Sequence, residues 1–302
     1  MKSGAWMRIA SAGLVWMMAL TTGCGWAGAG GGARGGGGLS TGGGSGSLVI
    51  VGGGLKDDNR PVYERFVALA GGTAARIGIV PTASGDGLKA GEEVAERWRA
   101  FGPASVVVVP LSKDDAARAD DEAVARTIAD CTGLWFTGGD QTRIVEVFRP
   151  GGRETRALQS VRGVLARGGV VGGTSAGAAI MTDPMITGGG SARANRADPE
   201  NPDSTSVRTG PGLGLLPVGL VDQHFLERNR MARLLDALGR GKARWGFGIS
   251  ENSAMVVDLR GGWIEAIGPA GVIVIDSSAR PAAARVMSTG DRLALPAPEP
   301  RR

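Results

Sequence analysis

The sequence has few of the residues that build metal sites and disulfide frameworks. Its 302 residues include one histidine and two cysteines. A zinc site usually takes several Cys or His ligands, and a disulfide framework needs more than one cysteine pair, so neither is indicated. Aromatic residues are also scarce, at 5% of the chain. We therefore expect a protein that uses ordinary side chains, with no metal and no cofactor.

Long runs of a single charge are missing as well. The 34 Lys and Arg residues are nearly balanced by 29 Asp and Glu residues, which leaves a formal net charge of +5. The basic residues are scattered, whereas nucleic-acid-binding proteins usually gather them in a patch or a run. The charge pattern therefore argues against a nucleic-acid partner.

The apolar run near the N-terminus is too short to span a membrane. Residues 9–20 are mostly apolar and follow Lys2 and Arg8, whereas a spanning helix needs about 20 apolar residues. A cationic start followed by a short apolar run is typical of a signal peptide. We therefore expect an exported protein.

The end of this segment resembles a bacterial lipoprotein box. The sequence Leu-Thr-Thr-Gly-Cys ends at Cys24, although Thr21 stands where such a box usually carries Leu or a similar residue. We expect residues 1–24 to be the signal peptide and any membrane contact to depend on a lipid at Cys24. Ordinary cleavage near residues 27–29 is the alternative, and it would leave a secreted or periplasmic protein.

The rest of the chain divides into a tether, one domain and a short tail. Residues 25–46 are rich in Gly, Ser and Thr and predict a flexible tether. Residues 47–293 suffice for a single α/β domain of ordinary size. Residues 294–302 are charged and rich in Pro, which predicts a frayed tail.

Apolar strands alternate with amphipathic helices through most of the domain. Such alternation predicts a mostly parallel sheet flanked by helices, with the functional loops at the carboxyl ends of the strands. Residues 254–276 alternate short strands with Gly-rich turns, which predicts antiparallel additions near the C-terminus. The expected strands span residues 48–51, 76–80, 105–110, 134–136, 169–173 and 214–221, and the expected helices span residues 61–70, 90–101, 120–129 and 141–167.

One motif has the form of a nucleophile elbow. The sequence Gly-Thr-Ser-Ala-Gly at residues 173–177 follows an apolar strand and precedes an Ala-rich helical segment. A serine in this strand–turn–helix context sits in a strained turn, where neighbouring Cβ atoms would clash. The pattern indicates Ser175 as a nucleophile and the backbone N–H of Ala176 as an oxyanion donor.

A serine nucleophile needs a base, and His224 is the only histidine in the chain. A carboxylate must then hold the imidazole in the correct tautomer. Glu251 follows an apolar strand and is one candidate, while Asp183 and Asp222 are competitors. A Ser-Lys dyad is possible in principle, although no lysine lies near a motif.

These motifs together resemble those of cyanophycinase and its relatives, the S51 serine peptidases. The resemblance runs from about residue 48 to residue 276. It rests on the motifs Gly52-Gly53-Gly54, Phe136-Thr137-Gly138-Gly139-Asp140-Gln141, Gly172 to Ala178, Asp222-Gln223-His224-Phe225, and Gly248-Ile249-Ser250-Glu251-Asn252-Ser253-Ala254. The resemblance implies an α/β fold like that of class I glutamine amidotransferases, which is flavodoxin-like.

The resemblance also implies roles for individual residues. It implies a triad of Ser175, His224 and Glu251, with Gly139 assisting Ala176 in the oxyanion hole. The residues at positions that line the substrate groove in the family are Gln141, Asp222, Gln223, Arg228, Arg230 and Arg233. Relatives often carry Asp where this chain has Ser250, so we expect the surroundings of Glu251 to differ from theirs.

The function implied is that of an exported serine-type peptidase. Its expected partner is a peptide substrate, either the β-aspartyl-arginine polymer cyanophycin or a related isopeptide. An esterase or amidase that uses the same site is an alternative, as is a catalytically silent binding protein with this fold. The sequence leaves a homodimer possible.

Overall fold

The computed structural model describes residues 7–8, 45–191, 206–241 and 243–297. The expected lipid attachment at Cys24 and most of the expected signal peptide and tether lie outside these residues. So does the end of the expected tail, from residue 298 on. The described part of the domain begins at Ser45, whose hydroxyl donates to the carbonyl of Ala166.

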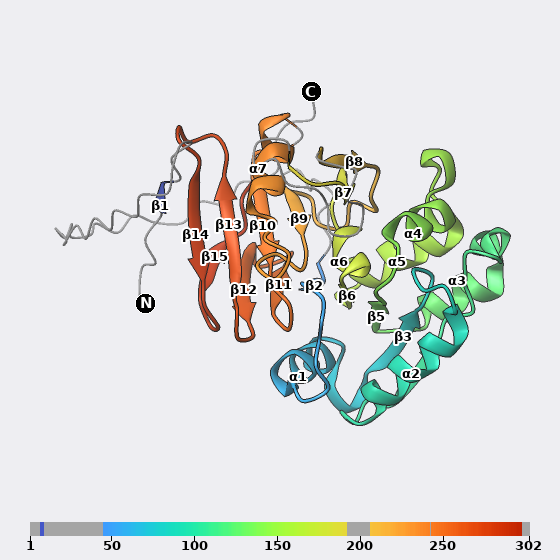
Figure 1. Ribbon diagram of the computed structural model, residues 1–302. Coiled ribbons are helices and arrows are strands. Elements are labelled where there is room, and N and C mark those ends of the chain that lie inside the picture. The colour runs from blue at the N-terminus through green and yellow to red at the C-terminus, as the bar shows by residue number, and fades with distance from the viewer. Residues whose placement is uncertain (1–6, 9–44, 192–205, 242, 298–302) are drawn as a thin grey trace, which may run out of the picture.

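An eight-stranded sheet forms the centre of the molecule (Figure 1). Five neighbouring strands are parallel, in the order β2 (Ser47–Val51), β6 (Val170–Thr174), β5 (Gly133–Phe136), β3 (Arg76–Val80) and β4 (Ser105–Val108). Three antiparallel strands extend the sheet beyond β2, namely β11 (Ala254–Asp258), β12 (Trp263–Ile267) and β15 (Arg292–Ala294). The expected mostly parallel sheet with antiparallel additions is therefore confirmed.

Helices cover both faces of the parallel strands. Alternate residues of a strand point to opposite faces, so Val49 and Val51 pack with Phe66 and Trp98, whereas Leu48 and Ile50 lie in the core on the other face. Helices α1 (Arg60–Leu69) and α2 (Gly87–Arg99) cover the first face, and α3 (Glu122–Ala129), α4 (Gln141–Phe148) and α5 (Arg156–Ala166) cover the second. Short 3-10 turns span Gly72–Ala74, Ala116–Asp120 and Pro150–Gly152.

A second sheet packs against the first and was not expected from the sequence. Its strands follow the order β1 (Met7–Arg8), β14 (Ala283–Met287), β13 (Val272–Asp276), β10 (Trp245–Ile249) and β9 (Leu220–Asp222). One face contributes Phe247 and Ile249 to the core shared with the large sheet, and the other is covered by α7 (Met231–Gly239) through Leu234 and Leu238. The remaining elements are α6 (Ala176–Ala179), β7 (Met185–Gly188) and β8 (Arg208–Gly210).

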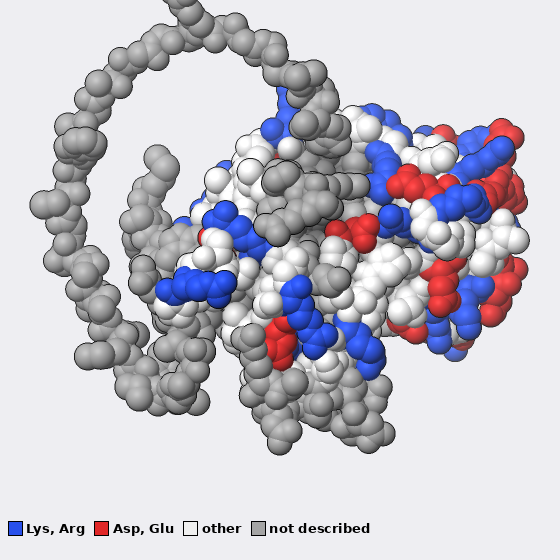
Figure 2. Space-filling model, turned by 90° about the horizontal axis from the view of Figure 1, so that it is seen from above, with Lys and Arg blue, Asp and Glu red and all other residues white. Residues whose placement is uncertain are grey.

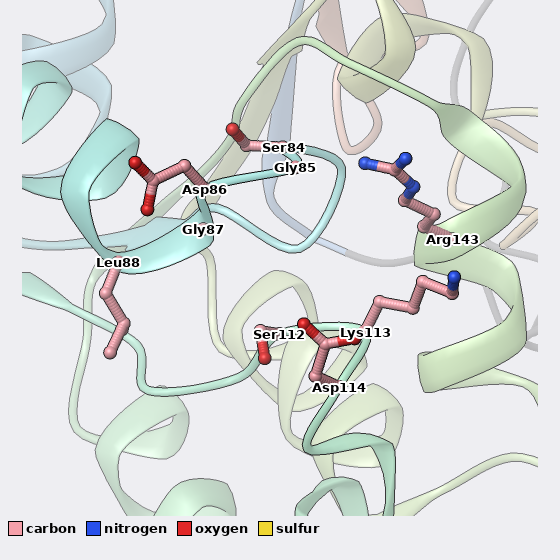
Figure 3. Close-up of a pocket in the computed structure, with 9 residues that line it drawn as sticks. All are labelled: Ser84, Gly85, Asp86, Gly87, Leu88, Ser112, Lys113, Asp114 and Arg143. Carbon is pink, nitrogen blue, oxygen red and sulfur yellow. The ribbon is translucent and has the colours of Figure 1, made fainter.

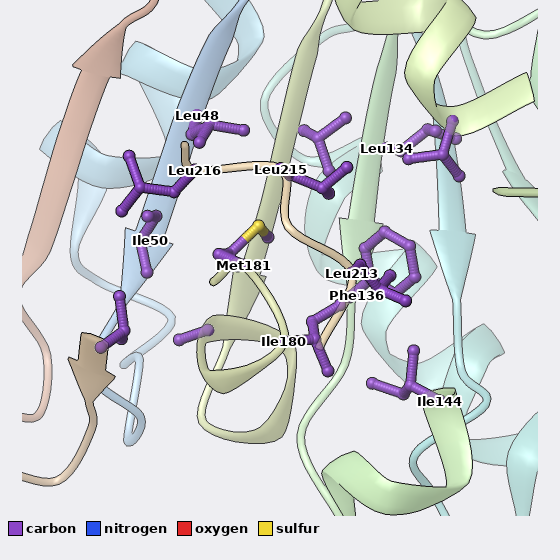
Figure 4. Packing of buried hydrophobic residues seen from close by; sticks show 14 of the residues in the cluster. Leu48, Ile50, Leu134, Phe136, Ile144, Ile180, Met181, Leu213, Leu215 and Leu216 are labelled. Carbon is purple, nitrogen blue, oxygen red and sulfur yellow. The ribbon is translucent and has the colours of Figure 1, made fainter. Parts of the chain in front are cut away.

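The apolar residues 214–221 do not form the expected strand, which is confined to Leu220–Asp222. Residues 213–216 instead form an irregular segment that crosses the large core beside Ile180 and Met181 (Figure 4). Its backbone is held by hydrogen bonds from Leu213 N to the Ile180 carbonyl and from Leu216 N to the Met181 carbonyl. Burial of the three leucines, rather than pairing in a sheet, accounts for the apolar run.

Charged side chains of both signs share the surface. Figure 2 shows basic and acidic residues beside one another at the end of the molecule that carries α3. Two ion pairs in this region are Arg126–Glu122 and Arg153–Asp120. Among the described residues, no helix has the length and apolar character that would be needed to cross a membrane.

Candidate active site

Ser175 occupies a strained turn between β6 and α6. Its φ is +54°, a left-handed value that side-chain-bearing residues seldom adopt. The flanking glycines permit the turn, because a Cβ on Gly173 would lie 2.6 Å from the carbonyl oxygen of Gly177, and a Cβ on Gly177 would lie 2.4 Å from that of Phe136. The serine is partly exposed, whereas Ala176 behind it is buried. This is the geometry that the elbow motif predicts.

His224 and Glu251 approach Ser175 from the second sheet. His224 follows β9 and Glu251 follows β10, which are parallel neighbours. Nε2 of His224 lies 2.9 Å from Oγ of Ser175, and Nδ1 lies 2.5 Å from Oε1 of Glu251. A carboxylate can only accept, so Nδ1 carries the proton and Nε2 is free to accept one from the serine hydroxyl. The structure thus brings the three residues of the expected triad into one hydrogen-bonded line.

The end of β2 connects these three segments. Successive carbonyls of Val51, Gly52 and Gly53 accept hydrogen bonds from the backbone N–H of Ser175, His224 and Asn252, at 3.2, 2.5 and 2.8 Å. One strand end therefore fixes the relative positions of loops that come from two sheets.

The glycines of this strand end also make room for the side chains of the site. A Cβ on Gly53 would lie 2.2 Å from Cε1 of His224, and a Cβ on Gly54 would lie 2.7 Å from Oε2 of Glu251. Both glycines have positive φ, +104° and +54°. Gly53 and Gly54 of the triple-glycine motif are required because the imidazole and the carboxylate lie directly against this backbone.

The backbone N–H groups of Gly139 and Ala176, the expected oxyanion donors, belong to segments next to Ser175. Gly138 lies against the nucleophile, since a Cβ there would be 3.5 Å from Cβ of Ser175. Gly139 follows with φ of +136°, and a Cβ on it would lie 2.2 Å from the Ala83 carbonyl oxygen. Within the described part of the chain, no acceptor is bonded to the N–H of Gly139 or of Ala176. Their role as oxyanion donors remains a prediction.

Burial lowers the pKa of His224 below its ordinary value. The hydrogen bond to Glu251 acts in the opposite direction, while the positive charge of Arg228 lowers the pKa further. A lowered pKa keeps the imidazole neutral at neutral pH, and only the neutral form can take a proton from serine.

Three of the residues expected to contact substrate lie below the surface beside His224. Asp222 is 1% exposed, and both of its oxygens bind the guanidinium of Arg233, which is 5% exposed. Nη1 of Arg230 lies 3.8 Å from Oδ1 of Asp222 and donates a hydrogen bond to the backbone carbonyl of Gln223 at 2.7 Å. Arg228 and Arg230 precede α7, and only Arg233 lies on the helix. Direct contact of this cluster with a substrate remains a prediction.

The other candidates occupy distinct positions. Gln141 begins α4, and its amide donates to the carbonyl of Thr187 at 3.0 Å, which ties this helix to β7. Gln223 is buried, and its side-chain oxygen accepts no hydrogen bond from the described residues. Of the competing acids, Asp183 pairs with Arg149, so neither it nor Asp222 is the carboxylate bonded to His224.

Sequence reasoning missed two side chains that position Glu251. The carboxylate of Glu227 accepts the backbone N–H of Glu251 at 3.0 Å. The buried amide of Asn59 donates to both oxygens of Asn252, the next residue, which has φ of +55°. Asn59 lies 193 positions away along the chain, so no local pattern could have indicated it.

Comparison with known proteins places the chain in a family. The model of peptidase family S51 matches residues 48–262. The cyanophycinase of Geminocystis herdmanii is 36% identical over 230 residues, which cover 75% of this chain and 79% of the relative. The cyanophycinase of Trichormus variabilis is 34% identical over 228 residues, which cover 74% of this chain and 72% of the relative.

The fold has a counterpart among solved structures. A peptidase from an acI-B1 Actinobacterium matches with a TM-score of 0.61 over 84% of this chain and 98% of that one. Its sequence identity of 18% means that this likeness supports the fold alone. The family model and the two cyanophycinases carry the assignment further: the chain belongs to peptidase family S51 and is a hydrolase related to cyanophycinases.

Proposed function

We propose that this peptidase cleaves its substrate through an acyl-enzyme at Ser175. The observation that carries the proposal is the line of two hydrogen bonds from Ser175 through His224 to Glu251, at 2.9 and 2.5 Å. Nucleophile, base and orienting acid within hydrogen-bond reach of one another form the arrangement that activates a weak nucleophile.

Each half of the reaction moves one proton through His224. The serine oxygen attacks the substrate carbonyl carbon while Nε2 takes the hydroxyl proton, and the new oxyanion is held by the N–H groups of Gly139 and Ala176. Nε2 then gives that proton to the leaving amine, the C–N bond breaks, and an ester to Ser175 remains. In the second half, water attacks the ester carbonyl with His224 again as base, the proton passes to the serine oxygen, and the acid is released. Glu251 stabilises the imidazolium in both halves.

The substrate that we propose is cyanophycin or a related β-aspartyl peptide. Two observed relatives are cyanophycinases, and the surroundings of His224 suit a substrate that carries both charges. Arg228 offers a positive charge near the imidazole, and the buried oxygen of Gln223, which accepts no hydrogen bond from the described residues, becomes an acceptor for a guanidinium or an amide once its side chain turns toward the substrate.

Incubation of the purified protein with cyanophycin tests this substrate. We expect release of β-aspartyl-arginine, identified by mass spectrometry, and no release by Ser175→Ala. Cleavage of isoaspartyl peptides without cleavage of cyanophycin would leave the proposed mechanism in place and overturn the substrate. Hydrolysis of simple esters alone would favour an esterase.

We also propose that the chain is exported and anchored through a lipid on Cys24. Support comes from the cationic start, the short apolar run and the box that ends at Cys24. Mass spectrometry of the mature N-terminus should find an acylated cysteine as its first residue. An unmodified N-terminus beyond residue 29 would indicate simple secretion instead.

A further inference from the structure

A hollow lies along the same edge of the large sheet as Ser175. It has a volume of about 300 Å³ and is lined by Ser84, Gly85, Asp86, Gly87, Leu88, Ser112, Lys113, Asp114 and Arg143 (Figure 3). These residues come from the loop after β3, the first turn of α2, the loop after β4 and helix α4. Ser175, by comparison, follows β6.

The hollow adjoins the expected oxyanion hole through one residue. The carbonyl of Ala83 accepts the N–H of Asp140 at 3.0 Å and Nη1 of Arg143 at 3.3 Å. The same oxygen lies against Gly139. Figure 3 shows the guanidinium of Arg143 directed from α4 toward the loop of Ser84 and Gly85. The wall of the hollow therefore begins next to the expected site of reaction.

Its charges are balanced and unpaired. Lys113 and Arg143 are positive, Asp86 and Asp114 are negative, and among the described residues none of the four forms an ion pair. Exposed arginines elsewhere do form them, as in Arg60–Glu64 and Arg126–Glu122. Equal numbers of both signs suit a ligand that itself carries a cation and an anion, rather than a simple anion such as phosphate.

The position of the hollow matches the reach of a polymer chain. The strand order is β6, β5, β3, β4, and neighbouring strands lie about 4.8 Å apart, so the ends of β3 and β4 are about 10 and 14 Å from that of β6. An extended chain advances about 3.3–3.6 Å per residue and covers this span in about three or four residues.

We propose that the hollow is a further subsite, which holds a β-aspartyl-arginine unit about three or four residues from the bond cut at Ser175. Arg143 and Lys113 bind the carboxylate of that unit. Asp86 and Asp114 bind its guanidinium, and the exposed side chain of Leu88 contacts its aliphatic part. The subsite rests on the proposed function and adds to it a preference for long substrates.

Binding to the inactive Ser175→Ala protein tests the subsite without turnover. The probes are synthetic β-aspartyl-arginine dipeptide and a four-unit oligomer, titrated by calorimetry. We expect the oligomer to bind more tightly than the dipeptide. Adding Arg143→Gln or Lys113→Gln should each weaken oligomer binding about threefold to fivefold, because each removes one exposed charge pair. Lys89→Gln, on α2 outside the hollow, is the matched control and should leave oligomer binding unchanged.

The outcomes separate the subsite from the proposed function. If both variants bind the oligomer as tightly as the control does, the subsite is overturned. Release of dipeptide from cyanophycin by the wild type would then still support the proposed function. Weaker oligomer binding in the variants, together with a wild type that does not cleave cyanophycin, would support the subsite and overturn cyanophycin as the substrate. If neither probe binds and the wild type does not cleave, both fall.

Discussion

The imidazole of His224 occupies the space that a side chain at Gly53 would fill, since a Cβ there would lie 2.2 Å from Cε1 of the ring. The backbone carbonyl of Gly53 also accepts a hydrogen bond from the N–H of Asn252, the residue after Glu251. Gly53 thus sets the position of both the expected base and its orienting acid.

Gly53→Ala should therefore lower kcat/KM by about 100-fold or more, because displacing a catalytic group by about 1 Å has an effect of this size. Gly102→Ala is the control, since Gly102 also has a positive φ, +74°, but has open space around it. The control should lose stability and keep its activity. Equal activity in the two variants would show that Gly53 does not position the imidazole.

Ser175→Ala and His224→Ala should each reduce hydrolysis to the same low floor. The two side chains act as one unit through their 2.9 Å hydrogen bond, so the double variant should be no slower than either single variant. Steady-state rates of the three proteins test this. A His224→Ala protein that kept most of its activity on a substrate cleaved through Ser175 would contradict the mechanism.

The activity should depend on pH through a His224 pKa below the ordinary value of about 6.5. The neutral imidazole is the active form, so kcat/KM should rise with pH through that lowered pKa and then level off. The charge of Arg228 helps to lower it, and Arg228→Gln should therefore raise the pKa and move the rising limb to higher pH. The test measures kcat/KM against pH with a small activated ester and compares the midpoint of the rising limb in Arg228→Gln with that in the control variant Arg126→Gln. An unshifted midpoint would exclude this influence of Arg228.

Asp222 and Arg233 should contribute to stability through their buried ion pair. Removing either charge takes away the direct, doubly hydrogen-bonded partner of the other buried charge, so Asp222→Ala or Arg233→Ala should lower the free energy of unfolding by about 3–5 kcal/mol. Arg126→Ala breaks an exposed pair and should cost less than about 1 kcal/mol. Denaturant unfolding measures both. Losses of similar size at the two sites would mean that the buried pair contributes no more than a surface one.

The features that the sequence predicts well are those coded by neighbouring residues. The elbow at Ser175 needs only a strand, a turn and a helix in succession, and the alternation of strands and helices predicts the parallel sheet. His224 was identified because no other histidine competes with it.

What escaped prediction depends on contacts between distant segments. Residues 254–258 join the large sheet whereas residues 245–249 join the second, although the two strands are separated by a short loop with no pattern that distinguishes them. The mutual pairing of Asp222 and Arg233 likewise follows from the helix position of Arg233, and the sequence alone made both look available to substrate. Such choices are decided by which surfaces pack together.

Covalent labelling by a fluorophosphonate tests the central claim most directly. Tryptic mapping of the wild type should locate the adduct on Ser175, and His224→Ala should label far more slowly because its serine lacks the base 2.9 Å away. An adduct on another residue, or hydrolysis that continues in a protein fully labelled at Ser175, would contradict the account.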